Sequence, residues 1–522
     1  MIEWTFSLAT GIIALTVTIW YVVRYLLIHD VVYIQGRPRH SWKSSKLLDR
    51  GCYCSVCEIL LVSTGRFCDS CGVCSHPECI KGAEKLFKCK EKHSKEDRPS
   101  RHKWTKGNLP LNRICSACRK DMDAVHGPGL CGFRCIWCQM CVHTACFPRM
   151  SEDCDYGEFR DLIIPPNCID AVRRRGSAKL LLKSIKAAPW PTWKPLIVIA
   201  NVKSGSSRAD DILSVFRGVL NPLQVAEMSR TGPQDALQWV ARISPKPCRV
   251  LVAGGDGTIG WVMNTLFSMA VESFPEICVL PLGTGNDLSR VLNWGSEAPD
   301  TIDPIEFLQQ VQRAEVAKLD RWVLEIAGAS SRIPLKRLLR RNVFMYNYFS
   351  VGVDAQVSLN FHRARESQFY MLSSRLINKM LYLCFGTHQV VVPDCVGLDK
   401  ELELWLDDEK IELPELQSVV FLNIDSWGAG VKLWEMSRDE DESAVNSFGD
   451  GIIEVLGIVS SFHIAQLQVG LSKPIRLGQA RTARVRLLKT CPVQVDGEPW
   501  EQTPCEIVIK CTDQATVLKR KN

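Results

Sequence analysis

The sequence predicts a multidomain chain with a hydrophobic N-terminal helix, two small zinc-binding modules, an α/β nucleotide-binding domain and an antiparallel β domain. Three observations support this prediction. An uncharged run of 20 residues stands near the N-terminus, sixteen of the 24 cysteines lie between Cys52 and Cys154, and three apolar strands downstream end in Gly-rich loops. The length of 522 residues agrees with three or four domains. A composition of 46% hydrophobic and 23% charged residues excludes a mostly disordered protein.

The N-terminal hydrophobic segment runs from Trp4 to Val23 without a charge, which is enough to cross about 30 Å of hydrocarbon as a helix. Glu3 precedes it and no small-residue cleavage site follows, unlike a cleavable signal peptide. Basic residues after the segment place the rest of the chain in the cytosol by the positive-inside rule. We therefore expect residues 1–29 to anchor the chain, spanning or re-entrant, in the endoplasmic reticulum or plasma membrane. A buried core helix is the alternative.

The formal net charge is +7, from 64 Lys and Arg against 57 Asp and Glu. This excess is mild for the length and does not argue for a nucleic-acid binder, whereas an anionic membrane surface suits it as a partner. Basic runs at residues 88–103 and 173–186 favour the same partner. Protein partners stay open.

The cysteine-rich region repeats one order of eight ligands twice. In the second copy the spacing is H-x12-C-x2-C-x16-C-x2-C-x4-H-x2-C-x7-C. Eight such ligands make two sites of three Cys and one His, which suits structural Zn²⁺, because four protein ligands leave no position for a substrate. Plain buried cysteines are the alternative. The candidate ligands are His40, Cys54, Cys57, Cys68, Cys71, His76, Cys79 and Cys89, then His102, Cys115, Cys118, Cys135, Cys138, His143, Cys146 and Cys154.

Three strand–loop–helix units follow residue 194. The runs PLIVIAN, RVLVAG and ICVLPL are apolar enough to be strands buried on both faces, and small residues after each let backbone N–H groups approach a phosphate. Asp256 follows the second strand, where its carboxylate can hold Mg²⁺. A Gly-rich turn with Asp as a helix cap is the alternative. The candidate phosphate-binding residues are Asn201, Ser204, Gly205, Gly254, Gly255, Gly257, Thr258, Gly283, Thr284, Gly285, Asn286 and Asp287.

The last third of the chain alternates in hydrophobicity. Residues 400–413 and 483–497 show this alternation most clearly and predict a mostly antiparallel β domain. In QVDGEPW, Asp496 and Glu498 are two residues apart and would point the same way on one strand. A hairpin turn at Gly497 is the alternative, and it would separate the two side chains.

Both cysteine modules resemble the diacylglycerol/phorbol-ester-type zinc finger of protein kinase C. This resemblance implies that one zinc ion is held by His102, Cys135, Cys138 and Cys154, and another by Cys115, Cys118, His143 and Cys146. The lipid-binding members carry a Pro before the first Cys pair and a Gln-Gly after it. Here Arg50-Gly51 and Asn112-Arg113 stand at the first place, and Ser63-Thr64-Gly65 replaces Gln-Gly in the first finger. Docking or autoinhibition is therefore as open as direct lipid capture.

The motif GGDGT together with LPLGTGNDLSR resembles the catalytic domain of the diacylglycerol kinase family. The segments NYFSVGVDAQVSLNFHRARE and QVDGEPW resemble the accessory domain of that family. The chain departs from it in the first loop, where NVKSGS replaces NPKSGG. The resemblance covers about residues 36–512. It implies zinc fingers at 36–91 and 101–156, a basic and Pro-rich linker at 157–194, a catalytic domain at 195–335 and an accessory domain at 340–512.

The same resemblance implies a lipid kinase that moves the γ-phosphate of ATP, with Mg²⁺, to the sn-3 hydroxyl of diacylglycerol and yields phosphatidic acid. Glu498 is then the expected base, Asp496 helps to hold the metal, and Asp354 is a reserve base. An N-terminal helix, two fingers and one kinase unit resemble a subtype associated with arachidonoyl diacylglycerol in the phosphatidylinositol cycle. The alternatives are a sphingosine or ceramide kinase and a non-catalytic zinc-finger adaptor.

Overall fold

The structure is a computed structural model in which two units can be described, residues 1–197 with 213–248 and residues 198–212 with 249–522. The predicted anchor and the candidates Ser204 and Gly205 lie outside the described residues. Among the described helices, none is both long and apolar enough to cross a membrane. The described residues are 33–35, 40–45, 52–61, 65–94, 100–110, 113–122, 132–173, 179–201, 209–228, 232–243, 245–329, 338–366, 395–438 and 446–521.

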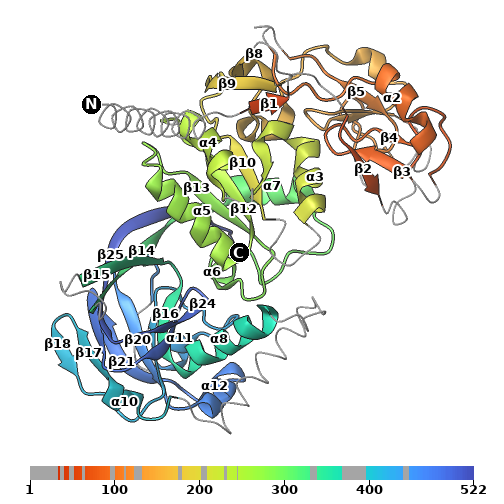
Figure 1. Cartoon of the computed structure of the whole chain (residues 1–522). Helices are drawn as coiled ribbons and strands as arrows, with labels where there is room; N and C mark the ends of the chain where they lie inside the picture. The colour runs from red at the N-terminus through yellow and green to blue at the C-terminus, as the bar shows by residue number, and fades with distance from the viewer. Residues whose placement is uncertain are drawn as a thin grey trace, which may run out of the picture. The chain divides into compact units, whose positions relative to one another are not determined.

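Each cysteine module in the first unit forms a small three-stranded antiparallel sheet (Figure 1). The first module also contains helix α2 (Ile80–Leu86). The apolar core of the second module is a few side chains around Met122, Val142 and Phe147. So small a core rarely supports a fold by itself, and metal sites are a common supplement. The sheets consist of β2 (Trp42–Ser45), β3 (Gly65–Cys68) and β4 (Cys74–Ser75), and of β5 (Trp104–Lys106), β6 (Phe133–Cys135) and β7 (Cys141–Val142).

The described parts of the segment expected to be a linker, residues 157–173 and 179–194, are structured. They contain the 3₁₀ helices η4 (Gly157–Leu162) and η5 (Pro166–Cys168) and the antiparallel strands β8 (Ile169–Arg173) and β9 (Lys179–Ile185). Phe159, Leu162 and Leu182 are buried, so these apolar side chains outweigh the basic and Pro-rich composition that suggested a linker.

In the second unit, a parallel arrangement carries the two described Gly-rich loops. Strands β12 (Arg249–Gly254) and β13 (Glu276–Pro281) pair in parallel and are almost entirely buried, as their continuous apolar sequences predict. Helix α5 (Asp256–Ser268) follows β12 and α6 (Asp287–Val291) follows β13. The Gly-rich loops therefore meet at one edge of the sheet, where the strands end (Figure 1).

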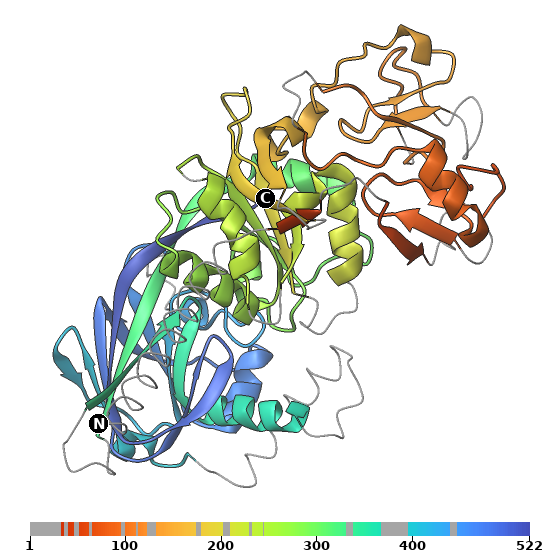
Figure 2. The same ribbon diagram turned by 45° about the horizontal axis from the view of Figure 1, so that its top comes forward.

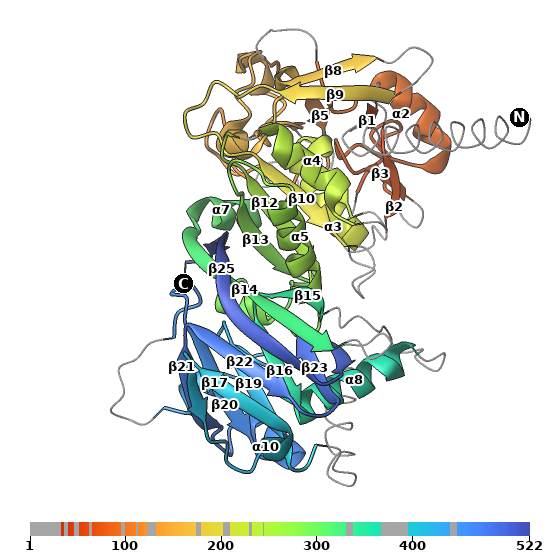
Figure 3. The same ribbon diagram turned by 60° about the vertical axis from the view of Figure 1, so that its left-hand side comes forward.

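The remaining strands of the second unit are mostly antiparallel, as predicted. Some extend the sheet that contains β12 and β13, and the others form a separate sheet (Figure 3). Strand β25 (Cys505–Lys519) joins the parallel strand β13 to the antiparallel strands, because it pairs with β13 near one end and with β14 (Glu315–Ala329) along its length. Side chains of both sheets, including Trp322, Phe349 and Phe421, form the core between them. The other strands that extend the sheet of β12 and β13 are β15 (Leu338–Met345), β17 (Leu402–Leu406), β18 (Glu409–Ile411) and β22 (Thr482–Leu487). The second sheet has the order β21 (Ile475–Ala480), β20 (Ile453–Ile458), β19 (Ser418–Leu422), β16 (Tyr348–Gly352), β23 (Cys491–Val495) and β24 (Glu498–Gln502).

Helices pack on the second of these sheets. Helix α8 (Val353–Glu366) contacts β16, β23 and β24, and α12 (Ser461–Gln468) contacts both β20 and α8. Figure 2 shows α8 in teal beside the blue helix α12. Ile464 and Leu467 of α12 and Trp434 of α11 (Leu433–Met436) share a core with the sheet.

Candidate nucleotide site and zinc centres

The sixteen predicted zinc ligands gather into four groups of four. Each group has three Cys and one His, and the ligand atoms within a group lie within 4.8 Å of one another. The groups are His40, Cys68, Cys71, Cys89; Cys54, Cys57, His76, Cys79; His102, Cys135, Cys138, Cys154; and Cys115, Cys118, His143, Cys146. These sets of thiol and imidazole ligands fit structural Zn²⁺, and the pairing in the second finger is the one that the resemblance implied.

Two of the ligand histidines use both ring nitrogens. His40 Nδ1 lies 3.3 Å from Cys71 Sγ, and its Nε2 lies 3.0 Å from the carbonyl oxygen of Phe87. In the second finger, His143 Nδ1 lies 3.3 Å from Cys118 Sγ and its Nε2 lies 3.2 Å from the carbonyl oxygen of Asp121. A carbonyl that accepts from the outer nitrogen orients the ring and leaves the inner nitrogen free to bind a metal.

We expect replacement of both Cys135 and Cys138 by Ser to release about one zinc ion per chain and to unfold the second finger, because folding of such a module depends on its metal. Elemental analysis of the purified protein measures the first effect, and proteolysis within residues 102–157 measures the second. Ser in place of Cys511, which belongs to none of the four groups, is the matched control. Four zinc ions in the double variant would contradict the ligand assignment.

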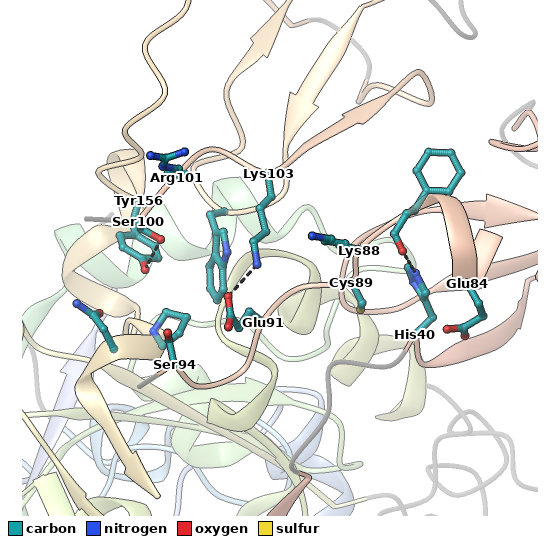
Figure 4. A pocket seen from close by; sticks show the side chains of 14 residues that line it. His40, Glu84, Lys88, Cys89, Glu91, Ser94, Ser100, Arg101, Lys103 and Tyr156 are labelled. Atoms are coloured by element: carbon teal, nitrogen blue, oxygen red, sulfur yellow. Dashed lines mark hydrogen bonds and ion pairs between the residues drawn. The ribbon is translucent and has the colours of Figure 1, made fainter. Parts of the chain in front are cut away.

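A cavity of about 740 Å³ lies in the first unit, between parts of both fingers (Figure 4). Two of its basic side chains form ion pairs: Lys103 Nζ lies 3.0 Å from Glu91, and Arg101 lies 3.2 Å from Glu152. Tyr156 donates a hydrogen bond of 2.8 Å to Ser100. The cavity contains none of the predicted phosphate-binding residues.

Residues of both fingers form hydrogen bonds and an ion pair at the C-terminal end of one helix of the catalytic region. Lys90, which is fully buried, donates to the carbonyl oxygens of residues 217–220 at the end of α3 (Ala209–Val219). Asp69 of the first finger pairs with Arg217 at 3.0 Å, and Gln139 of the second donates to the carbonyl of Gly218 at 3.2 Å. The last carbonyl groups of a helix need such donors, so the fingers complete this helix.

The two described Gly-rich loops touch through their backbones. A methyl carbon placed on Gly283 would lie 2.7 Å from the Cα of Gly255, so the two loops fit together only without side chains here. Asn286 has a φ of 52° and is buried. Its Oδ1 accepts from the N–H of Gly283 and its Nδ2 donates to the carbonyls of Gly283 and Ser296. Asn286 therefore stabilises the loop, while residues 283–285 remain partly exposed.

Asn201 and Thr258 connect the first and second loops. Asn201 donates from Nδ2 to Thr258 Oγ1 at 3.0 Å, and its backbone N–H donates to the carbonyl of Ala253. A methyl carbon on Gly254 would collide with Thr258, which is buried. Thr258 does not cap α5, because the N-cap is Gly255 and makes no side-chain bond. The first N–H groups of α5 are thus not used by a side-chain cap.

Asp256 joins the second loop to the third. Its carboxylate accepts from the N–H groups of Asp287 and Leu288 at 3.0 and 3.1 Å, and so caps α6. Asp287 accepts in turn from the Ser426 hydroxyl at 2.5 Å and from the Ala429 N–H at 3.3 Å. Asp256 therefore caps a helix, as the alternative predicted. The helix that it caps is α6, however, and not α5, which begins with Asp256 itself.

Asp496 occupies a tight turn between β23 and β24. It and Gly497 both have positive φ, 50° and 85°, as a two-residue hairpin turn requires. Its carboxylate accepts from the backbone N–H groups of Tyr346, Asn347 and Tyr348 at 2.8–3.1 Å. Asp496 and Gly497 therefore form a hairpin turn, as the alternative predicted. The Asp496 carboxylate also fixes the backbone at the start of β16.

Three carboxyl groups thus lie in one electrostatic neighbourhood. Burial, reinforced by the nearby charge of Asp287, raises the pKa of Asp256 to about 6. Burial likewise raises the pKa of Asp496 to about 7, with a further contribution from Asp256. Asn347 Oδ1 is buried in the same region and has no hydrogen-bond partner. An oxygen-rich set of this kind fits Mg²⁺, because a divalent cation would compensate the clustered negative charge.

Glu498 begins β24 and faces the second loop. A methyl carbon on Gly257 would lie 3.1 Å from Glu498 Oε1. His362 of α8 places its Nε2 3.7 Å from the other carboxylate oxygen. The Glu498 side chain remains 68% exposed, so this carboxylate is accessible from solvent beside the second Gly-rich loop.

Asp354, the predicted reserve base, is far less accessible. It is fully buried and accepts hydrogen bonds from Ser350 at 2.5 Å, from Gln494 at 2.8 Å and from Ser418. These donors, and the absence of any exposed surface on this side chain, place Asp354 in the interior and do not suit the role of a base.

Sequence reasoning missed Ser426, Asn347, Arg290 and His362. Arg290 donates from Nε to the carbonyl of Gly285 at 3.2 Å, and a methyl carbon on Gly430 would lie 3.0 Å from its guanidinium. One signal was available for Ser426: the apolar run SVVFLNI ends in DSWGAG, which is again a strand followed by polar and small residues.

Comparison with known proteins defines the class to which these regions belong. Residues 195–319 match the diacylglycerol kinase catalytic domain, residues 344–499 the diacylglycerol kinase accessory domain, and residues 102–157 the phorbol esters/diacylglycerol binding (C1) domain. The chain therefore contains the catalytic and accessory domains of the diacylglycerol kinase family, together with a C1 domain. These matches agree with the predicted family, and the C1 match falls on the second cysteine module.

Three curated relatives carry diacylglycerol kinase names. The chain is 31% identical to the Caenorhabditis elegans protein named probable diacylglycerol kinase 3, over 92% of its own length. It is 38% identical to human diacylglycerol kinase theta over 67% and 32% identical to human diacylglycerol kinase zeta over 92%. The chain spans 64%, 38% and 57% of the lengths of these relatives. A crystal structure of a Bacillus anthracis diacylglycerol kinase aligns with 62% of this chain and 96% of its own at 14% identity, and the TM-score of 0.38 is too low to carry weight.

Proposed function

We propose that this protein is an ATP-dependent lipid kinase that phosphorylates the sn-3 hydroxyl of diacylglycerol and releases phosphatidic acid. The observation that carries the proposal is the meeting of two Gly-rich loops with Asp256, Asp287 and Glu498 within domains that match this family. Phosphoryl transfer depends mostly on positioning and on charge neutralisation, and this arrangement supports both.

Each group in the site has a proposed role. The backbone N–H groups of the Gly255 and Thr284 loops bind the phosphates, with Ser204 and Gly205 contributing from the first loop. Glu498 accepts the proton of the attacking hydroxyl, because its carboxylate is exposed beside the second loop. Asp256 and Asp496 would hold Mg²⁺, which would supply charge neutralisation at the transferred phosphoryl group. His362 orients Glu498 through the 3.7 Å contact.

Several finer features are proposed on the sequence alone. The order of a hydrophobic N-terminal segment, two fingers and one kinase unit resembles the epsilon subtype of diacylglycerol kinases, with its preference for arachidonoyl diacylglycerol. The protein would then lie at the endoplasmic reticulum or plasma membrane, reduce diacylglycerol signalling to protein kinase C and supply phosphatidylinositol resynthesis. Zn²⁺ in both fingers is structural.

An assay with three lipids tests the proposed function. The purified chain should transfer radioactive phosphate from ATP to diacylglycerol and leave ceramide and sphingosine unlabelled, as separated by thin-layer chromatography. Labelled sphingosine or ceramide would indicate the alternative lipid kinases, and no labelled lipid would indicate the adaptor.

Replacing Glu498 by Gln should reduce kcat for diacylglycerol by about 10²–10⁴-fold, the usual contribution of a general base. The KM for ATP should stay unchanged, because the base touches the acceptor hydroxyl. Glu501→Gln is the matched control: Glu501 lies on the same strand, is about as exposed and pairs with Arg363 at 2.8 Å. Equal kcat values in both variants would exclude Glu498 as the base.

A further inference from the structure

The region around α12 presents a stripe of apolar side chains to solvent. Val459, Phe462, Val469 and Leu471 are 42%, 59%, 67% and 77% exposed. Phe462 lies in α12, Val459 stands just before its N-cap Ser460, Val469 is its C-cap, and Leu471 follows two residues later. Ile464 and Leu467 of the same helix are buried in the core of the unit. We call these four exposed residues the α12 face.

Along the chain, the charges that flank the α12 face within residues 455–495 are of one sign. Residues 455–472 contain no Asp, Glu, Lys or Arg, and the next residue is the exposed Lys473. From there to residue 495 the chain adds Arg and Lys but no carboxylate. On neighbouring α11, Glu435 is paired with Lys432 at 2.7 Å. An uncharged apolar stripe with a cation at its edge complements the surface of a bilayer that contains anionic lipid.

Helix α12 contacts two segments of the candidate site. Gln468 of α12 donates to the carbonyl of Gly428 at 3.1 Å, within the loop whose Ser426 and Ala429 hold Asp287. On its other side α12 contacts α8, which carries the histidine beside Glu498 (Figure 2). A bilayer that covers the α12 face would thus be close to the carboxylate that the proposed function assigns as the base.

We propose that the α12 face is a membrane-docking surface that inserts its apolar side chains at the headgroup–acyl boundary of an anionic bilayer. Docking there brings the kinase site to a lipid whose hydroxyl lies at that boundary, and this consequence rests on the proposed function. Isolated exposed apolar residues need no explanation, but four within residues 459–471, beside a site for a lipid, do.

A double variant of the full chain, Phe462→Glu with Leu471→Glu, tests the docking surface. On phosphatidylcholine–phosphatidylserine vesicles containing long-chain diacylglycerol, the apparent KM for the lipid should rise about tenfold or more, from the lost burial of two large apolar side chains. The KM for ATP and the turnover of water-soluble dioctanoylglycerol should stay unchanged. Leu488→Glu is the matched control, because Leu488 is 49% exposed and lies outside the α12 face.

Photocrosslinking supplies a readout that needs no kinase activity. A photoreactive residue in place of Phe462 should form phospholipid adducts on vesicles without diacylglycerol, and one in place of Leu488 should not. Equal crosslinking at both positions, or equal vesicle KM values for the double variant and Leu488→Glu, would overturn the docking surface. The docking surface would also be overturned if the parent chain formed a dimer that the double variant does not form, because the face would then bind a second copy. Adducts at position 462 without any turnover of dioctanoylglycerol would retain the docking surface and reject the proposed function.

Discussion

Replacing Gly283 by Ala should abolish ATP-dependent phosphorylation while the protein stays folded. The new methyl carbon would lie 2.7 Å from Gly255 Cα and 2.8 Å from Asn286 Oδ1. Both contacts are too short to exist, so the second and third loops must move apart. Misplacement of binding groups by about 1 Å typically costs about 10²-fold in rate, and here several backbone N–H groups would move together.

Gly260→Ala is the matched control for this experiment. Gly260 lies inside α5, and a methyl carbon there would lie 3.8 Å from a Tyr346 ring carbon, an ordinary contact. Ala is also the better helix former by about 0.5–1 kcal/mol, so this variant should keep its activity and unfold at the same or a higher temperature. Steady-state kinetics and thermal unfolding of both variants provide the comparison. A Gly283→Ala enzyme with near-normal kcat/KM would mean that the close approach of the loops is not needed for turnover.

Replacing Lys90 by Met should loosen the end of α3 by about 3 kcal/mol, because carbonyl groups that are buried without a donor cost about 1–3 kcal/mol each. The Lys90 ammonium lies 2.9–3.2 Å from four carbonyl oxygens, those of residues 217–220, and 4.6 Å from the centre of the Trp137 ring. Met fills similar space but donates nothing. Hydrogen exchange of the amides of residues 213–220 should therefore become faster by about a hundredfold.

Lys88→Met is the control for this second experiment, because Lys88 stands two residues earlier and is exposed. It should leave the exchange of α3 within the range of ordinary surface substitutions, about 0.5 kcal/mol. Elemental analysis should find the same zinc content in both variants, which separates a loosened helix from an unfolded finger. Equal exchange rates in the two variants would show that the Lys90 contacts contribute little to the stability of α3.

The zinc ligands were predictable because their signal is local. Close pairs such as Cys135 and Cys138 or Cys54 and Cys57 are already near each other along the chain, and a metal needs those atoms at a short fixed distance. The same applies to the glycines of the Gly-rich loops. A sharp turn after a buried strand requires them in the sequence itself, and the close packing of Gly255 on Gly283 agrees with that requirement.

Residue type alone did not distinguish one Asp from another. Asp354 and Asp496 both stand in motifs that resemble the family, but Asp354 lies among Ser350, Ser418 and Gln494 in the interior while Asp496 lies beside Asp256. The environment of a carboxylate depends on which strands and helices pack around it. The Asp354 contacts with Ser418 and Gln494 span 64 and 140 positions, so no local pattern could supply them.

The sequence by itself determined the zinc-binding residues, the Gly-rich loops, the antiparallel character of the last domain and the resemblance to the diacylglycerol kinase family. The tertiary structure alone decided which groups complete the site and which are structural. Ser426 reaches Asp287, His362 reaches Glu498 and Lys90 reaches the end of α3 across separations of 139, 136 and 130 positions. Such partners are brought together by burial of apolar faces over whole sheets and helices, a long-range effect that leaves no mark at the polar residues themselves.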